Sequence, residues 1–368
     1  MLKSTYKIPP LPPKAELETM KVLRALPDAH RYLAELKGKA SAIPNQGILI
    51  DTLSLQEAKA SSEIENIVTT QDEIFQRNIF PDGPASNSAK EVFRYQDALK
   101  RGFDLLHKKK GLITNNSLIE MYRKLKNRRD GFRTTTGTAL KDLSRDKIVY
   151  VPPQNPKDII QHMTALEKFI NQENLRQPLD PIVKMAIIHH QFESIHPFPD
   201  GNGRIGRILN VLYLTKVDLL NIPILYLSRS IIQRKNEYYK RLQAVRDTGD
   251  WEGWLLYVIG AVTETSQTTL FLVEGIRALM AEYKSIIRSE LPKIYSQDLL
   301  NNLFRHPYTR IEYLEHDLRV SRQTAAKYLE QLVSHGLLKK HKAGKNNYYI
   351  NTPLADMLIG VSKSDPDE

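Results

Sequence analysis

The sequence of 368 residues contains no cysteine. Without thiols the chain cannot form disulfide bonds, bind zinc through thiolates or use a cysteine nucleophile, which excludes several classes of enzyme. It also lacks a run of the roughly 18 apolar residues that a membrane-spanning helix needs. Its start, MLKSTYKIPPLPPK, has no apolar core like that of a signal peptide. We therefore expect a cytoplasmic protein that has no membrane partner.

Acidic residues are too few to balance the basic ones. The chain has 53 Lys+Arg against 42 Asp+Glu, which gives a net charge of +11. Such a surplus favours partners that carry phosphate, either nucleotides or nucleic acid, but it can also serve solubility alone. The length exceeds what one hydrophobic core usually supports, so we expect two or three domains.

Strand-like patterns are rare as well. Apolar residues recur at intervals of three and four over most of the chain, which predicts a mainly α fold. Alternating runs at about 136–140 and 147–151 predict one β-hairpin. Farther on, helix, turn, helix and a two-stranded ribbon follow in the order of a winged helix-turn-helix. We divide the chain into an N-terminal arm and helical region (1–100, with a helix at about 54–69), a helical core with the hairpin (101–285), a winged helix domain (290–355) and an acidic, disordered tail (361–368).

The stretch HPFPDGNGRIGR, residues 196–207, joins two strongly apolar helical segments. A glycine-rich start of a helix presents free backbone N–H groups at the positive end of the helix dipole, where an anion can bind. Arg204 and Arg207 are three residues apart and could both reach a polyphosphate. Asp200 is an oxygen ligand suited to Mg²⁺, and His196 could act as a base near neutral pH. The alternative is a polar turn without a ligand.

This stretch matches the motif His-x-Phe-x-Asp/Glu-Gly-Asn-Gly-Arg-x-x-Arg and so resembles the Fic (Fido) family. The resemblance implies a Fic helical core and a protein adenylyltransferase, which moves AMP from ATP to a side-chain hydroxyl of a target protein or of itself. It further implies that His196 is the general base, that Asp200 holds Mg²⁺ and that Phe198 anchors the loop. The phosphates of ATP are then bound by the segment that comprises Gly201, Asn202, Gly203, Arg204, Ile205, Gly206 and Arg207.

Two further segments are assigned by the same resemblance. The hairpin between 131 and 153 is similar to the family's flap, to which a target segment adds as a strand. We expect the target to dock at Thr138, Leu140, Ile148 and Tyr150. The stretch NEYYKRL resembles the segment that contacts adenine, with Tyr238 or Tyr239 as the ring. Paired tyrosines on a helix can equally be core and boundary residues.

An inhibitory pattern lies upstream. SSEIEN, residues 61–66, matches Ser/Thr-x-x-x-Glu-Gly/Asn of the family, with Ser61, Glu65 and Asn66 at the defining positions. A carboxylate beside Arg207 would occupy the guanidinium that the γ-phosphate requires. The alternative is a helix whose Glu63 and Glu65 face solvent.

Other interpretations remain open. His189, Glu193 and His196 share one helical face at a spacing typical of metal ligands, which would suit a metal hydrolase. The winged helix could bind DNA, or mediate dimerisation or partner docking. Acidic neighbours reduce the positive charge of this region. The residues that could contact DNA are Arg322, Gln323, Lys327, Lys339, Lys340, Lys342 and Lys345. Within the Fic family, the same motif also serves removal of AMP or transfer of other phosphate-containing groups. A homodimer is also possible.

Overall fold

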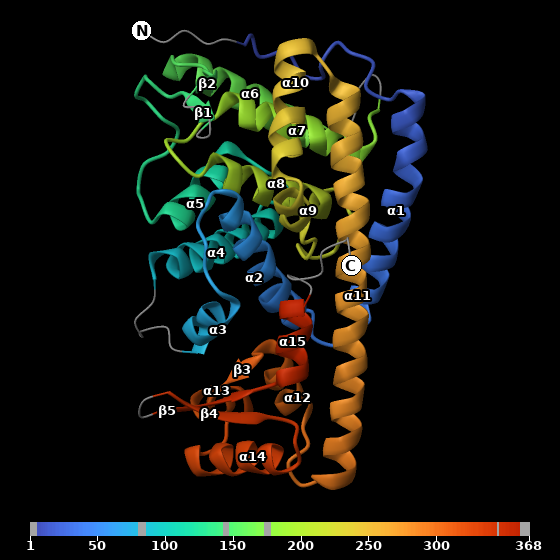
Figure 1. Ribbon diagram of the computed structural model, residues 1–368, viewed down its shortest axis with the longest axis vertical. Helices are drawn as coiled ribbons and strands as arrows, with labels where there is room; N and C mark the ends of the chain where they lie inside the picture. Colours follow the sequence, from blue (N-terminus) through green and yellow to red (C-terminus); the bar gives the residue numbers. More distant parts are fainter. Residues whose placement is uncertain (1–5, 80–85, 143–146, 173–177, 344–345, 361–368) are drawn as a thin grey trace.

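The computed structural model describes residues 6–79, 86–142, 147–172, 178–343 and 346–360. It is mainly helical, as expected, with two small antiparallel sheets (Figure 1). The helices are α1 (Met20–Ser41), α2 (Gly47–Ile64), α3 (Gln71–Ile79), α4 (Asn87–Lys108), α5 (Asn115–Lys126), α6 (Pro156–Asn171), α7 (Pro181–Ile195), α8 (Asn202–Lys216), α9 (Leu227–Gln233), α10 (Lys235–Thr248), α11 (Trp251–Glu290), α12 (Gln297–Arg305), α13 (Ile311–Leu318), α14 (Arg322–Ser334) and α15 (Thr352–Gly360). The strands are β1 (Leu140–Asp142), β2 (Lys147–Tyr150), β3 (Tyr308–Thr309), β4 (Lys339–Ala343) and β5 (Asn346–Ile350). The tail 361–368 lies outside the described residues, and so does Lys345.

Two buried helices, α7 and α8, form the centre of the body. Every residue of α7 from Ile182 to Ile195 is buried, because the segment is apolar nearly all round. Asp180 caps its first turn, and Pro181 occupies the first helical position, where no backbone donor is needed. The short loop from 196 to 201 then leads directly into α8. The sequence correctly predicts this loop between two buried helices.

The upstream helix has other bounds than expected. The prediction of a helix at about 54–69 is wrong, because α2 begins at Gly47 and ends at Ile64. Asn66 adopts a left-handed conformation with φ +61°, which a helix cannot continue, and Ile67 N–H then bonds to the carbonyl of Ser62 at 3.0 Å. Glu65 is therefore the last residue before the chain turns away.

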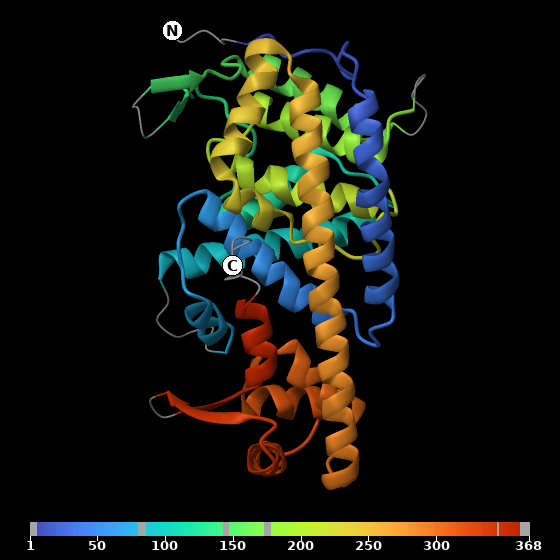
Figure 2. The ribbon, with the colours of Figure 1, turned by 45° about the vertical axis from the view of Figure 1, so that its right-hand side comes forward.

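The hairpin is shorter than expected. β1 begins at Leu140, so Thr138 lies in the loop before the strand. Gln154 explains the late start, because its side chain bonds to the backbone of Gly137 and Thr138 and keeps these groups from strand pairing. β1 and β2 pair antiparallel, and Figure 2 shows the hairpin projecting from the helical body. Residues 143–146 of the hairpin are outside the described part.

The helix α11 spans most of the length of the molecule. It has 40 residues, lies beside α1 over one part and reaches the C-terminal helices with the other (Figure 1, Figure 2). No break in the backbone therefore marks a boundary at 285, where we expected the core to end. Residues 297–360, here called the C-terminal region, hold α12 to α15 and a sheet of order β3-β5-β4. These elements fit the expected order, while the winged-helix assignment itself stays a prediction.

Among the described residues, no helix is long and apolar enough to cross a membrane.

Phe198 packs at the centre of the motif loop. It is fully buried, and its ring stacks on Tyr122 at a centroid distance of 4.2 Å and an interplanar angle of 7°. We predict that Phe198→Ala lowers the free energy of unfolding by about 3 to 5 kcal/mol, because it leaves a cavity in a packed core. Urea denaturation measures the change. Phe271→Ala is the control: this phenylalanine is 69% exposed, and its removal should alter stability little.

Candidate functional site

His196 lies at the point where α7 ends. Its backbone has φ +50°, a conformation that is uncommon for residues other than glycine and is typical of functional sites. Nδ1 of its ring is buried and has no hydrogen-bond partner among the described residues. Burial lowers the pKa of His196 to about 4, and the nearby guanidinium groups of Arg133 and Arg246 contribute. The ring is therefore neutral at physiological pH and can accept a proton.

Arg133, which the sequence did not single out, ties the hairpin to this loop. Its backbone N–H donates to the carbonyl of Pro197, and its Nε donates to the carbonyl of His196, both at 2.8 Å. A further guanidinium nitrogen donates to the carbonyl of Pro153, just after the hairpin. Buried arginines need such partners, and here the partners fix a strained backbone. An isolated arginine in a turn-rich stretch gives no signal from which this role could be predicted.

The start of α8 has the geometry of an anion site. Gly201 precedes the helix with φ +77°, and no side chain caps the first N–H groups. The Asn202 side chain is buried and bonds to both the N–H and the carbonyl of Phe198 at 2.8 Å. Asn202 thus shapes the loop with its side chain, which leaves the binding of an anion there to the backbone. Ile205 is buried in the core, and Gly206 lies against Glu193 of α7, where a β-carbon would be 2.7 Å from Oε1.

The inhibitory pattern meets the motif at Arg207. This arginine is 1% exposed, and it donates from Nε to Oγ of Ser61 at 2.8 Å and from Nη2 to the carbonyl of Ser61 at 2.9 Å. Nη2 also donates to Oε1 of Glu65 at 2.7 Å. Burial alone would lower the pKa of Arg207, but the Glu65 carboxylate raises it. The three bonds occupy most of the guanidinium, so Glu65 does not face solvent without a partner.

The carboxylate of Glu65 also stands over the start of α8. A β-carbon at Gly203 would overlap its Oε1 atom, and would lie 3.0 Å from Nη1 of Arg207. A negative oxygen therefore sits at the helix N-terminus beside a guanidinium, as an anionic ligand would. Asn66, the third residue of the pattern, ends the helix and accepts a bond from Nζ of Lys235 at 2.9 Å.

Asp200 and Arg204 have ionic partners other than Glu65. Asp200 is 61% exposed and pairs with Nζ of Lys126 at 2.6 Å, whereas the buried Arg204 pairs with Glu91 of α4. Burial would raise the pKa of Asp200, but Lys126 lowers it, so the carboxylate is ionised. An exposed carboxylate beside an anion site fits Mg²⁺, which takes one or two carboxylates together with phosphate oxygens. The described residues hold no cluster of three or more His, Asp or Glu that could bind a metal ion alone.

The metal-hydrolase interpretation does not fit this geometry. His189 uses both ring nitrogens in protein bonds: Nε2 lies 2.8 Å from the Tyr238 hydroxyl and Nδ1 lies 3.1 Å from Asn210 Nδ2. Burial lowers the pKa of His189 to about 3 and raises that of Glu193 to about 7, which are the directions expected for groups in a core. Both side chains therefore support the packing of α7.

Two predicted contact residues are core residues instead. Tyr238 is 2% exposed, while the neighbouring Tyr239 is 43% exposed and remains available as the adenine ring. Tyr150 is also buried: its hydroxyl donates to the carbonyl of Ser194 at 2.6 Å, and the Arg246 guanidinium lies 3.9 Å from the centre of its ring. Such a residue anchors the hairpin and cannot dock a target. The burial of Tyr150 corrects the prediction, whereas that of Tyr238 decides between two alternatives; both depend on which helix or strand face meets the body, which the sequence period alone does not show.

The exposed apolar residues of the hairpin are Ile148 and Val149, at 41% and 44%. Leu140 is half-buried and pairs with Tyr150 in the strand register. Because neighbouring residues of a strand point to opposite faces, each face of β2 has one exposed apolar side chain that could contact another chain.

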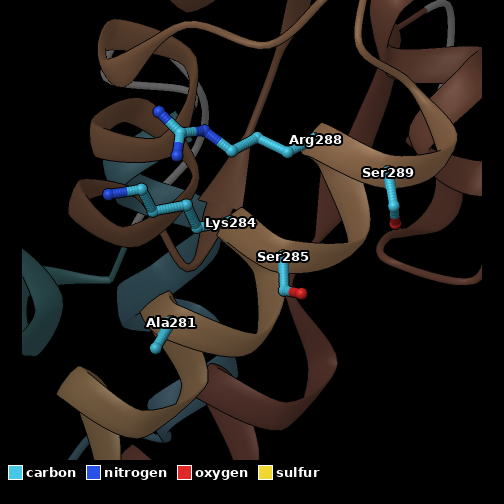
Figure 3. A pocket seen from close by; sticks show the side chains of 5 residues that line it. All are labelled: Ala281, Lys284, Ser285, Arg288 and Ser289. Carbon is cyan, nitrogen blue, oxygen red and sulfur yellow. The ribbon is translucent and has the colours of Figure 1, made fainter.

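The basic residues of the C-terminal region are partly neutralised. Arg322 pairs with Glu312 at 2.9 Å, and Lys340 pairs with Glu330 at 2.6 Å. These ion pairs leave less positive charge for contacts with phosphate, so they do not favour DNA binding by this region, which stays a prediction. A shallow depression of about 490 Å³ lies on one face of α11, away from the motif (Figure 3). The depression is too open to enclose a nucleotide, because all its lining residues come from this one helix. They are Ala281, Lys284, Ser285, Arg288 and Ser289.

The two guanidinium groups near His196 make its titration testable. We predict that NMR of the imidazole ring gives a pKa near 4, and that Arg133→Met raises this pKa toward the ordinary value of about 6.5, because a positive neighbour is removed. Arg31→Met is the control, since Arg31 pairs with Asp28 on the surface of α1. An unchanged pKa in Arg133→Met would contradict the electrostatic explanation.

Comparison with known families gives three matches in chain order. Residues 23–104 match the Fic/DOC family N-terminal model, 112–214 match the Fic/DOC family, and 279–354 match the C-terminal domain of SoFic-like protein adenylyltransferases. Among curated proteins, the chain is 29% identical over 177 residues to a probable protein adenylyltransferase of Aquifex aeolicus, which covers 47% of this chain and 51% of that protein. It is 28% identical over 157 residues to protein adenylyltransferase fic-1 of Caenorhabditis elegans, which covers 42% and 28%. The matches thus span about half or less of these relatives.

Solved structures share the fold. A Fic family protein from Desulfovibrio desulfuricans superposes with a TM-score of 0.57 at 16% identity, over 90% of this chain and 96% of that one. Fic-1 of C. elegans gives a TM-score of 0.52 at 21% identity, over 69% and 74%. With the complete motif on the loop and the first turns of α8, and with the three domain matches in order, the chain belongs to the Fic/DOC family.

Proposed function

We propose that this protein transfers AMP from ATP to a hydroxyl group of a target protein or of itself, and that Glu65 inhibits the transfer. The observation that carries the proposal is the position of the Glu65 carboxylate, bonded to Arg207 and set over Gly203 at the start of α8. A carboxylate that is held there marks a site built for a negatively charged ligand. The names of the curated relatives support the same activity.

The proposed reaction uses His196 as the base. Its neutral ring accepts the proton of the target hydroxyl, whose oxygen forms a bond to the α-phosphorus of ATP while the bond from this phosphorus to the pyrophosphate oxygen breaks. The backbone N–H groups of Asn202 and Gly203 bind the charged oxygens of the transferred phosphate, while that of Gly201 donates to Oδ1 of Asp200 at 2.6 Å. Arg207 then pairs with the outer phosphates once Glu65 has left, and Arg204 lies one turn earlier on the same helix. Mg²⁺ bound at Asp200 would neutralise phosphate charge, for which Lys126 has to give way.

The target is held by the hairpin in this proposal. β1 is short and only β2 pairs with it among the described residues, so the hairpin can accept an added strand. Exposed Ile148 and Val149 supply the apolar contacts. Backbone pairing demands little of the target's sequence, which leaves the modified residue type open among Ser, Thr and Tyr.

Removal of AMP is the alternative within the same site. A water molecule activated near His196 would then attack the phosphorus, with the modified hydroxyl as the leaving group. The presence of Glu65 and Asp200 does not distinguish the addition of AMP from its removal. We place the enzyme in the cytoplasm, where ATP is supplied, and include neither a DNA partner nor a dimer in the mechanism.

Mass spectrometry of the intact protein tests the proposal. With ATP and Mg²⁺, we predict that Glu65→Gly gains AMP roughly tenfold faster or more than the parent, because a charge-assisted bond to Arg207 contributes about 1.5–3 kcal/mol. The double variant Glu65→Gly with His196→Ala should gain none. Glu63→Gln is the matched control, because Glu63 is on the same helix and faces Lys59 at 3.7 Å. If Glu65→Gly incorporates no more AMP than the parent, the proposed inhibition is wrong.

The role of Asp200 is tested separately. In the Glu65→Gly background, we predict that Asp200→Asn raises the Mg²⁺ concentration needed for half-maximal AMP transfer by roughly tenfold or more, since an amide replaces the charged carboxylate. Magnesium titration at saturating ATP measures the shift. Asp104→Asn, on α4, is the control. Equal Mg²⁺ requirements in both variants would exclude Asp200 as the metal ligand.

A further inference from the structure

Two helices flank the segment that carries Glu65. α2 ends at Ile64 and α3 begins at Gln71, so that residues 65–70 form the link between them. Both helices also touch the C-terminal region: α12 lies against α2, and β3 lies against α3 (Figure 1). Because a helix moves as a rigid body, contacts at the start of α2 help to set the position of Glu65 at its end.

The contact at the start of α2 is a shared ion pair. Asp51 accepts bonds at 2.5 Å from Nζ of Lys100 on α4 and from Nε of Arg305 on α12. The Asp51 side chain is 19% exposed, so the pair is partly shielded from water. Burial alone would raise the pKa of Asp51, but Lys100 and Arg305 lower it, which shows that both cations stabilise the ionised form. Asp51 and Lys100 lie in the segment that matches the Fic/DOC N-terminal model, here counted with residues 112–214 as the Fic body, whereas Arg305 comes from the C-terminal region.

The contact at α3 is independent of this pair. The Tyr308 hydroxyl of β3 donates to Oδ1 of Asp72 at 2.9 Å. Its ring packs on Phe75, with centroids 5.0 Å apart. Phe75 is 2% exposed, so the C-terminal region covers an apolar residue of α3 that would otherwise be closer to water.

The middle of α2 is held by the Fic body itself. Glu57 is buried and accepts bonds from the Tyr95 hydroxyl at 2.9 Å, and from the N–H of Ser228 at 2.9 Å at the start of α9. Glu57, Ser61 and Glu65 are spaced by four residues and so share the face of α2 that meets Arg207. These bonds hold the middle of α2 to α4 and α9, and the contacts of Arg305 and Tyr308 add to them at the start of α2 and on α3.

We propose that the C-terminal region clamps α2 and α3 in the position that places Glu65 on Arg207, so that undocking of this region activates the enzyme. This inference rests on the proposed AMP transfer and names its regulation. The inhibited and released states are in equilibrium, and contacts made only in the inhibited state shift the population toward it. Loss of Arg305 and Tyr308 contacts then raises the population of the released state.

The test uses the full chain with Arg305→Met and Tyr308→Phe, singly and combined. Tyr308→Phe removes the bond to Asp72 but keeps the ring on Phe75. Two readouts are measured: hydrogen exchange of the amides at 61–70, and AMP gain with ATP and Mg²⁺. We expect the combined variant to show roughly fivefold faster exchange and fivefold faster AMP gain, the size expected for a part-shielded ion pair and one hydrogen bond. Lys39→Met is the control, since Lys39 joins α1 to α11 through Glu274.

A Glu65→Gly background separates the possible outcomes. If the clamp acts through Glu65, the combined substitution adds no AMP gain in that background. Unchanged exchange at 61–70 overturns the proposal, and so does faster exchange without faster AMP gain when Glu65→Gly itself is active. If Glu65→Gly transfers no AMP, the proposed function fails, and the exchange measurement alone decides whether the C-terminal region holds this segment.

Discussion

The contact between Glu65 and Arg207 is the interaction on which the rest of the site depends. It joins α2 to α8 across 142 positions of sequence, and it places a carboxylate on a buried guanidinium at the start of a helix. Arg207 is almost fully buried, so the loss of its partners without replacement would leave a charge in the core. In the proposed reaction, an anionic ligand such as the γ-phosphate would supply the replacement. Inhibition and nucleotide binding would then be two ways to satisfy the same arginine.

The loop before α8 is held in one conformation, because its polar groups form hydrogen bonds within the loop and to Arg133. The Asn202 side chain bridges both backbone groups of Phe198, whose ring is stacked on Tyr122. Arg133 holds the carbonyl of His196 in a left-handed conformation. These contacts do not use Nδ1 of the imidazole or the first N–H groups of α8. A preorganised site of this kind needs little rearrangement during a reaction.

Cations are paired with carboxylates around this loop. Arg204 with Glu91, Lys126 with Asp200 and Arg207 with Glu65 each place a cation beside a carboxylate. ATP and Mg²⁺ would exchange partners in two of these pairs, with Lys126 released from Asp200 and Glu65 released from Arg207. The C-terminal region adds a further pair of a cation and a carboxylate, Arg305 with Asp51, at the start of α2.

The sequence by itself determined the mainly helical fold, the loop between two buried helices and the residues of the motif, because period and turn-forming residues are local properties. It also pointed to Ser61, Glu65 and Asn66, through the resemblance of SSEIEN to the family's inhibitory pattern, whereas the end of α2 before Asn66 came only from the structure. The tertiary structure alone decided that Tyr150 and Tyr238 are buried, that Thr138 lies outside the strand, and that Arg133 holds the loop. Only the packing of distant segments fixes which face of a helix meets the core and which carbonyl a guanidinium reaches, and neither is a local property of the chain.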